Sequence, residues 1–271
     1  MQPSIAFIGA GNMSRAILGG MLTNGYPAQQ ITATGRDKDK LADLAAQGVN
    51  VTTDNAQAMA SAEIVVLAVK PQMMKDVTIP LAAIAQQHKP LIVSVAAGIP
   101  AQSLNKWLGG NLAIIRCMPN TPALVQKGAS ALFANDLVSD QQKQTVQQMI
   151  ANTGLALWVD SQDQLDAVAA LSGSGPAYYF LLMESMISAA IAQGLSREIA
   201  EKLTLQTALG AASIAHQSED TPAQLRRKVT SPKGTTEQAI LSFERAGFAD
   251  MIQQGMQANI KRSQELATEL G

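Results

Sequence analysis

Residues 4–14 read SIAFIGAGNMS, and this stretch decides the fold of the first half of the chain. Residues 4–8 are mostly apolar and predict a short buried strand, after which the pattern becomes helical. Gly9 permits a tight turn, Gly11 lets the backbone approach a pyrophosphate, and Ser14 is small enough for close helix–strand packing. A glycine loop between a strand and a helix predicts a dinucleotide-binding site.

The same alternation of strand and helix continues through the first half of the chain. Strands separated by helices imply right-handed crossovers and a parallel sheet. We therefore expect an α/β Rossmann-type parallel sheet domain over residues 1–160. The further strands that we expect are Ile31–Thr34, Ile64–Val69, Leu91–Val95 and Leu112–Cys117, with Ala129–Ala134 and Leu155–Val159 at one edge; the expected helices include Met13–Asn24 and Lys38–Gln47.

The second half of the chain, residues 161–271, predicts an all-α domain. From Gln162 onward Ala, Leu, Met, Ile and Gln dominate with helical periodicity. The segments 189–192 and 208–212 have few polar positions, whereas a surface helix of a monomer normally shows a polar face. This favours a dimerisation domain that packs against a second subunit; the alternative is a central helix covered by its own neighbours.

The end of the second expected strand selects the cofactor. Sites for NAD usually place an acidic residue there, on the ribose 2′-hydroxyl. This chain has Thr34 and Arg36 instead, and a hydroxyl with a guanidinium suits a 2′-phosphate. We therefore expect NADPH, with NADH as the weaker ligand. Asp37 leaves the other choice open, because a shift of one residue would bring a carboxylate near the ribose.

Further cofactor contacts are expected where other strands end, since open α/β sheets bind ligands at that edge. Small residues there let a cofactor lie against the backbone. The loop Met118–Pro122 adds a rigid polar segment to the same edge. The cofactor segments at the strand ends are Ala68, Val69, Lys70 and Pro71, then Val95, Ala96 and Ala97.

A second informative stretch, residues 230–237, reads TSPKGTTE and lies in the helical half. It is a tight Pro/Gly loop that runs into a helix. The first turn of a helix offers unpaired N–H groups and the positive end of a dipole, so this loop can hold a carboxylate. The alternative is an ordinary capped helix start.

Composition excludes several other classes of function. The 271 residues carry a formal net charge of −1, which gives no support to nucleic-acid binding. No apolar run is long enough to cross a bilayer, and no signal peptide is visible, so we expect a cytoplasmic protein without membrane attachment. The single cysteine, Cys117, is expected to be a buried small hydrophobic residue. We expect no metal site.

The motifs together resemble the Δ1-pyrroline-5-carboxylate reductase family, in their order and spacing and over essentially the whole chain. The motifs that carry the resemblance are Gly9–Ser14, Ala68–Pro71, Met118–Pro122, Ser172–Tyr178 and Thr230–Thr236. Ser14 and Lys233 depart from the family pattern, which commonly has Ala and a small residue at these positions.

The resemblance implies reduction of L-1-pyrroline-5-carboxylate to L-proline by NADPH, the last step of proline biosynthesis. It also implies a homodimer or a ring of dimers, with the active site where the helical domain of one subunit meets a neighbour. It places NADP at Ile8, Gly9, Ala10, Gly11, Asn12 and Met13, at Thr34 and Asn55, and at the strand-end segments given above; it places the substrate at Gly234, Thr235 and Thr236, with Glu219 nearby.

The chain lacks the base that a related alcohol-oxidising enzyme would need. Its two histidines, His88 and His216, lie in no motif, and Tyr179 stands where β-hydroxyacid dehydrogenases have a lysine. A protonated cyclic imine accepts hydride without such a base, and Thr236 is the candidate that hydrogen-bonds the ring nitrogen; its other role would be helix capping. The alternatives are an NADP-dependent hydroxyacid dehydrogenase and a non-catalytic NADPH-binding regulator.

Overall fold

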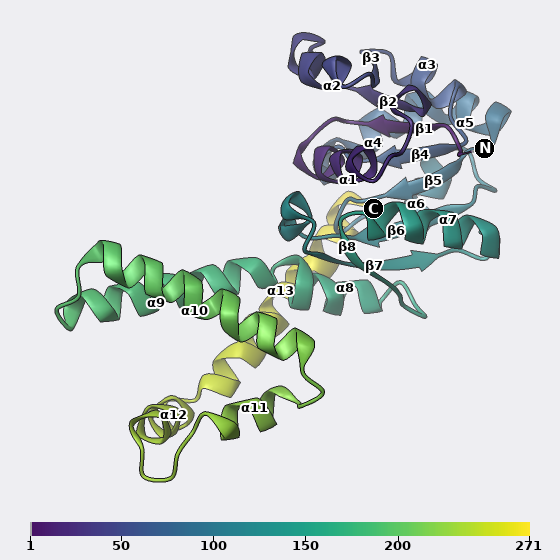
Figure 1. Ribbon diagram of the computed structural model, residues 1–271. Coiled ribbons are helices and arrows are strands. Elements are labelled where there is room, and N and C mark those ends of the chain that lie inside the picture. The colour runs from purple at the N-terminus through teal and green to yellow at the C-terminus, as the bar shows by residue number, and fades with distance from the viewer. Residues whose placement is uncertain (1) are drawn as a thin grey trace. The chain divides into compact units, whose positions relative to one another are not determined.

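The computed structural model describes residues 2–271 and shows an eight-stranded sheet flanked by helices, followed by a helical region (Figure 1). The strand order is β3-β2-β1-β4-β5-β6-β7-β8, so the order reverses between β1 and β4. Ligands of open α/β sheets bind beside such a reversal. The strands are β1 (Ile5–Ile8), β2 (Ile31–Thr34), β3 (Asn50–Thr52), β4 (Ile64–Leu67), β5 (Leu91–Ser94), β6 (Ile114–Met118), β7 (Gly128–Ala134) and β8 (Gly154–Trp158).

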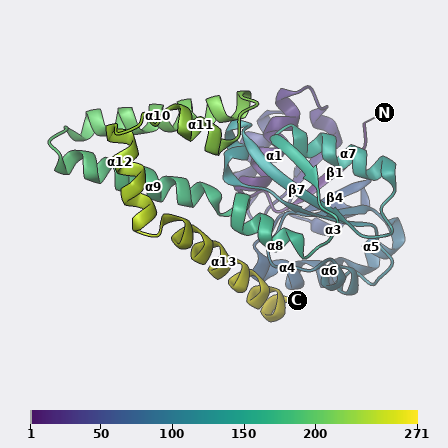
Figure 2. The same ribbon diagram turned by 90° about the horizontal axis from the view of Figure 1, so that it is seen from below.

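Side chains of the central strands alternate between two buried cores. In β1, Ile5 and Phe7 join the core beneath α1, α2 and α7, whereas Ala6 and Ile8 join the core beneath α3 to α6. The two layers of helices are visible in Figures 1 and 2. Burial on both faces explains why β1 and β4 are continuous apolar runs. These helices are α1 (Asn12–Thr23), α2 (Ala42–Ala46), α3 (Asn55–Ala60), α4 (Pro71–Thr78), α5 (Ala82–His88), α6 (Ala101–Trp107) and α7 (Asp140–Ala151).

One part of the predicted parallel sheet is wrong, because β7 runs antiparallel to β6. The link between them holds only the short 3-10 turn η4 (Thr121–Val125), and a parallel pair needs a crossover of a dozen or more residues. The helix α7 supplies such a crossover between β7 and β8, which pair in parallel. The α/β fold class is confirmed, with a mostly parallel sheet.

Two other local expectations need correction. The strand β3 was not predicted, because it has only three residues and two of them, Asn50 and Thr52, are polar. The helix expected over residues 38–47 is a 3-10 turn, η2 (Asp39–Leu41), that leads into the short α2. Other 3-10 turns are η1 (Ala28–Gln30) and η3 (Ile79–Leu81).

The chain forms two compact units. The first comprises the chain up to Ser174 together with Ala258–Gly271, and the second comprises Gly175–Gln257. This division differs from the boundary at residue 160 that we expected, since α8 (Gln164–Val168) and the π-helical turn η5 (Ala169–Gly173) belong with the sheet. The second unit holds α9 (Gly175–Ala192), α10 (Arg197–Gln217), α11 (Pro222–Lys228), α12 (Thr235–Arg245) and the beginning of α13 (Phe248–Leu270).

The end of α13 packs within the first unit. Ser263 Oγ donates a hydrogen bond to Asp166 Oδ1 at 2.6 Å, and Asn259 Nδ2 donates to Ser174 Oγ at 2.8 Å. The Cβ that a side chain would add at Gly98 would lie 3.2 Å from Leu266 Cβ, so this helix comes close to the loop after β5. The last turns of the chain therefore belong to the domain that carries the sheet.

Cys117 lies in β6 and is buried, as expected. Burial raises the pKa of its thiol to about 12, so it stays protonated and unreactive at neutral pH. The neighbouring Arg116 is only 8% exposed, and its Nε has no hydrogen-bond partner among residues 2–271. Burial lowers the pKa of Arg116 to about 10, although Asp166 opposes the shift.

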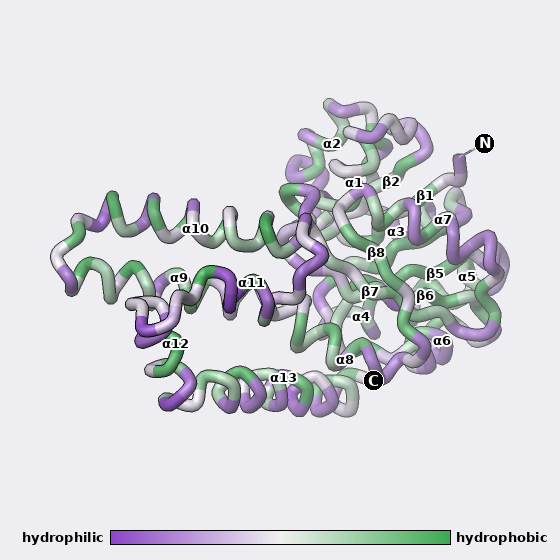
Figure 3. Tube along the Cα trace, turned by 60° about the horizontal axis from the view of Figure 1, so that its bottom comes forward, coloured by the Kyte–Doolittle hydropathy of each residue, from purple (hydrophilic) through white to green (hydrophobic). Residues whose placement is uncertain are grey.

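The second unit exposes many large apolar side chains. Hydrophobic positions recur along its helices, as the green stretches of α9 and α10 show (Figure 3). In α9, Phe180 and Leu181 are each 63% exposed, and in α10 Leu209 is 62% exposed. Neighbouring helices of this unit leave these residues uncovered, which argues against the alternative of a central helix buried by its own neighbours. Within residues 2–271, no helix combines the length and the apolar character that a membrane crossing requires.

Candidate active site

The glycine loop joins β1 to α1 in a conformation that requires glycine. Gly9 has φ +96°, and a Cβ at this residue would lie 2.8 Å from Val69 Cγ1 and 3.2 Å from the carbonyl carbon of Ala68. A Cβ at Gly11 would meet no atom within 4 Å. Gly9 therefore allows the loop to pass against the end of β4, while Gly11 faces open space where a ligand can come close to the backbone.

Two buried hydroxyl groups hold the peptide groups of Gly9. The Gly9 N–H donates to Thr34 Oγ1 at 3.1 Å, and Ser14 Oγ donates to the Gly9 carbonyl oxygen at 2.5 Å. Both side chains are 1% exposed. This explains Ser14, the departure from the usual third glycine-motif residue: it fits the close packing and adds a hydrogen bond to the turn.

The beginning of α1 fits a pyrophosphate. Its N-cap, Gly11, offers no side-chain cap, and the first N–H groups of the helix have no internal partner. These groups and the helix dipole favour an anion at this position. Ile8 pairs with Leu67 in β4, and Leu67 pairs with Ser94 in β5. The register therefore brings together the predicted contact segments that follow β1, β4 and β5.

The candidates for the 2′-phosphate lie just beyond β2. Arg36 is exposed and free to reach a ligand, whereas the Thr34 hydroxyl is buried against Gly9. Asp37 Oδ1 accepts a hydrogen bond from the Asp39 N–H at 3.0 Å, and its other oxygen lies 4.0 Å from Lys40 Nζ. The Asp37 carboxylate thus makes one hydrogen bond within its own turn and stays half exposed. Asn55 is the first residue of α3, which follows β3 at the same edge.

Arg15, in the first turn of α1, is a residue next to the glycine loop that was not predicted from the sequence. Its Nε donates to the Ala10 carbonyl at 3.2 Å, its Nη2 donates to the Lys40 carbonyl at 2.6 Å, and its Nη1 pairs with Asp43. The hydrogen bond from Arg15 lowers the pKa of Asp43. Arg15 thereby ties the glycine loop to the segment that carries Arg36. Its place in the first turn of α1 was the only sequence signal.

The loop after β6 connects to the Ser172–Gly175 motif. The Asn120 side chain donates to the Ser172 carbonyl at 3.0 Å and accepts from the Ala129 N–H at 2.9 Å. A Cβ at Gly173 would lie 2.5 Å from Met118 Cε. Two motifs that are far apart in sequence therefore meet in the first unit, and the π-helical turn η5 brings them together.

In the second unit, α12 begins at Thr235 with Gly234 as its N-cap, and no side chain caps it. Thr236 is the second residue of the helix, so the capping role considered for it is wrong. The Thr235 and Thr236 side chains are exposed and make no hydrogen bond among residues 2–271. Glu219 is exposed in the turn between α10 and α11. The assignment of these residues to the substrate stays a prediction.

The two histidines and Tyr179, which could act as acids or bases, lie on exposed helix surfaces and not in one site. His88 and His216 are exposed at the ends of α5 and α10, and Tyr179 is 67% exposed. No cluster of three or more His, Cys, Asp or Glu with metal-binding geometry occurs in the described part of the chain, residues 2–271.

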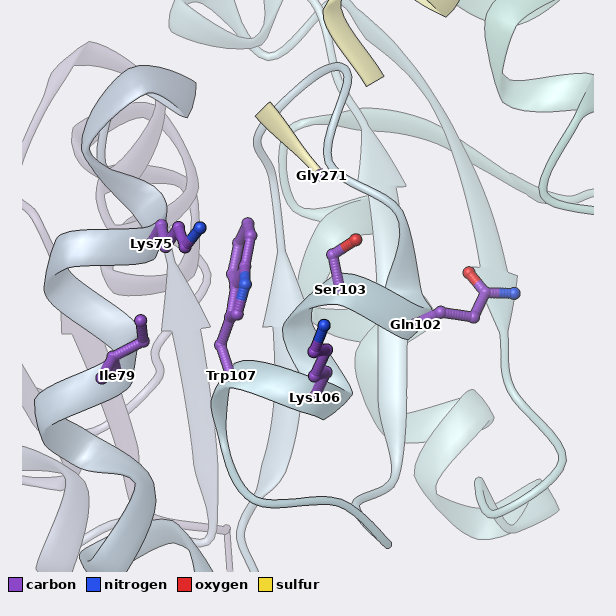
Figure 4. A pocket seen from close by; sticks show the side chains of 7 residues that line it. All are labelled: Lys75, Ile79, Gln102, Ser103, Lys106, Trp107 and Gly271. Atoms are coloured by element: carbon purple, nitrogen blue, oxygen red, sulfur yellow. The ribbon is translucent and has the colours of Figure 1, made fainter. Parts of the chain in front are cut away.

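A cavity of about 500 Å³ lies between α4 and α6 (Figure 4). The Trp107 ring lies with the side chains of Lys75 and Lys106 to either side of it. None of the predicted cofactor or substrate residues lines this cavity, so we do not assign the active site to it. Its lining residues are Lys75, Ile79, Gln102, Ser103, Lys106, Trp107 and Gly271.

Known proteins that resemble this chain match it along its whole length. The pyrroline-5-carboxylate reductase of Pseudomonas aeruginosa is 53% identical over 99% of this chain and 98% of that protein. The chain belongs to the pyrroline-5-carboxylate reductase family. The predicted family and its oxidoreductase class are therefore confirmed.

Two family models divide the chain in agreement with the predicted fold class. The model for pyrroline-5-carboxylate reductase dimerisation matches residues 162–266, and the model for NADP oxidoreductase, coenzyme F420-dependent, matches residues 4–98. The dimerisation match covers the helices with exposed apolar side chains, so the reductase is a homo-oligomer, as predicted.

Solved structures of the family share this fold. The pyrroline-5-carboxylate reductase of Coxiella burnetii, 45% identical, superposes with a TM-score of 0.94 over 98% of this chain and 99% of that chain. The pyrroline carboxylate reductase of Plasmodium falciparum, 27% identical, superposes with a TM-score of 0.88 over the same shares and was solved with NADP bound.

Proposed function

We propose that this chain reduces L-1-pyrroline-5-carboxylate to L-proline with NADPH, the last step of proline biosynthesis. The observation that carries the proposal is the beginning of α12. Gly234 leaves the helix without a side-chain cap, so the N–H groups of Thr235 and Thr236 are free to bind a carboxylate. The second support is the glycine loop of the first unit, whose geometry fits a dinucleotide.

The cofactor is held by the loops at the strand ends. The free N–H groups at the beginning of α1 bind the pyrophosphate, and the Arg36 guanidinium pairs with the 2′-phosphate of NADPH. Asp37, which would favour NADH, already accepts a hydrogen bond from the Asp39 N–H within its own loop. The preference for NADPH also agrees with the NADP found in the Plasmodium falciparum relative.

NADPH supplies the hydride, and the chain's own residues orient the substrate. The uncapped helix start holds the carboxylate, which fixes the direction of the ring. The Thr236 hydroxyl has no partner within the described residues 2–271, so it is free to hydrogen-bond the imine nitrogen, directly or through water. Reduction adds a hydride to the imine carbon and leaves a proton on nitrogen; no hydroxyl proton has to be removed.

The substrate site and the dimer belong to the same proposal. The α12 start lies in the unit that exposes apolar helices, and we propose that the reductase works as a homodimer or as a ring of dimers. Glu219, in the turn before α11, is placed near the substrate by family resemblance. We propose no nucleic-acid or membrane partner.

Two other functions compete with this one. A hydroxyacid dehydrogenase needs a base, and an exposed Tyr179 stands where the lysine of that class would be. A non-catalytic NADPH-binding regulator would not need the free helix start of α12.

The test is NADPH oxidation with the cyclic imine, compared with NADP reduction by 2- and 3-hydroxyacids. Turnover with the imine alone supports the proposal; turnover with a hydroxyacid, or NADPH binding without any turnover, overturns it.

A further inference from the structure

A strained turn precedes the proposed carboxylate site. The Gly234 N–H donates to the Ser231 carbonyl at 2.9 Å, which closes a four-residue turn. Pro232 is the second residue of this turn, and Lys233, the third, has φ +61°. Proline followed by a positive φ is typical of a type II turn, whose third residue is usually Gly or Asn. A lysine is therefore an unfavourable choice for this backbone.

Glu237 holds that turn. Its Oε2 accepts a hydrogen bond from the Lys233 N–H at 2.8 Å. As the third residue of α12, a glutamate commonly reaches back to the N-cap N–H. Here the N-cap is Gly234, whose N–H already bonds Ser231, so Glu237 bonds the residue before it. The turn is thus fixed in its strained conformation without any ligand.

Two residues of opposite charge flank the beginning of α12: Lys233 directly precedes the N-cap Gly234, and Glu237 is the third residue of the helix. The Glu237 carboxylate lies in the first turn of the helix, where it opposes the binding of a second anion. The Lys233 ammonium is exposed, and no carboxylate lies within 4.0 Å of it among residues 2–271. A substrate carboxylate would therefore meet one repelling charge and one attracting charge.

We propose that Glu237 and Lys233 set the affinity of the α12 start for the substrate carboxylate. Glu237 is a positioning residue: it holds the turn through the Lys233 N–H. Lys233 is a specificity-determining residue, since its ammonium offsets the charge of Glu237 and attracts an anionic ring. This inference rests on the proposed function, because it concerns the same carboxylate site.

Glu237→Gln separates the hydrogen bond from the charge, because the amide oxygen still accepts from the Lys233 N–H. We expect the KM for pyrroline-5-carboxylate to fall about two- to fivefold at low salt, with the difference lost at high salt. Glu237→Ala removes both features, and we expect this KM to rise at least about fivefold. In both variants the KM for NADPH should stay at the wild-type value, whereas a distortion that reached the cofactor site would change it as well.

Lys233→Gly tests the charge without straining the turn. Glycine adopts the positive φ readily, so the melting temperature should not fall. The KM for pyrroline-5-carboxylate should nevertheless rise about three- to tenfold at low salt and approach the wild-type value at high salt. Glu198→Gln is the matched control, because Glu198 is an exposed glutamate that pairs with Lys202 on α10.

The outcomes separate this inference from the proposed function. If the wild-type reductase does not turn over pyrroline-5-carboxylate, the proposed function is wrong. If the wild type is active but Glu237→Gln and Glu237→Ala change KM equally, the positioning role is wrong. If Lys233→Gly leaves KM unchanged at low salt, the charge role is wrong, and the proposed function stands.

Discussion

The Thr34 hydroxyl accepts a hydrogen bond from the Gly9 N–H at 3.1 Å, and this contact links the end of β2 to the glycine loop. Thr34 is 1% exposed and Gly9 is partly buried, so this hydrogen bond lies at the inner side of the loop. Thr34, which we expected to contact the 2′-phosphate, therefore also stabilises the turn that is expected to bind the pyrophosphate.

Thr34→Val should weaken the binding of NADPH and of NADH to a similar extent. Valine keeps the volume but removes the acceptor of the partly buried Gly9 N–H, which costs about 1 kcal/mol. The KM for NADPH and the KM for NADH should rise by similar factors in steady-state assays. Thr34→Ser keeps the hydroxyl and should stay near the wild type. A loss confined to NADPH would show instead that the hydroxyl reads the 2′-phosphate directly.

Arg36→Ala should weaken the binding of NADPH but not that of NADH, unlike Thr34→Val, which should affect both. Loss of a charge-assisted hydrogen bond costs on the order of 1.5–3 kcal/mol, so the KM for NADPH should rise about ten- to a hundredfold. The KM for NADH should change little, since NADH has no 2′-phosphate. Lys38→Ala removes a nearby exposed charge and should have a smaller effect. Equal effects of Arg36→Ala on the two cofactors would exclude Arg36 as the phosphate ligand.

Thr236→Val should lower turnover without weakening NADPH binding. The lost hydrogen bond to a polar or charged group corresponds to about 1.5–3 kcal/mol, or about ten- to a hundredfold in kcat. Because Thr236 is not the N-cap of α12, the melting temperature should stay close to that of the wild type. Thr235→Val is the control, since Thr235 is expected to contribute its backbone N–H. Full turnover in the Thr236 variant would end its catalytic assignment.

The exposed apolar helices predict that the reductase assembles through its second unit. Light scattering or sedimentation should give the mass of a dimer or of a multiple of dimers. Leu209→Glu places a charge among exposed apolar residues of α10 and should shift the population to smaller, less active species. A stable monomer with full activity would contradict both the interface and the expectation of a site shared between subunits.

The sequence predicted the central strands and the glycine loop well, because their signals are local. The run Ile64–Leu67 is apolar throughout since both faces of β4 are buried, and Gly9 is required by a positive φ and a close approach. The antiparallel β7 could have been predicted from the short link after β6, but the strand pattern alone does not give direction.

The less local features were missed. The strand β3 is short and polar and forms only because β2 offers it an edge. Arg15 reads as an ordinary helix residue until the fold brings it to Asp43 and to the Lys40 carbonyl. For Thr236, composition alone could not show whether it or Gly234 would be the N-cap, because that depends on the backbone of the turn.

The most direct test of the central claim follows the hydride itself. The reductase is incubated with L-1-pyrroline-5-carboxylate and NADPH that carries deuterium at the transferred position of the nicotinamide, and the product is analysed by mass spectrometry and NMR. We predict L-proline with one deuterium on the former imine carbon, at a rate that equals NADPH oxidation. NADPH oxidation without labelled proline, or no oxidation with this imine, would contradict the account.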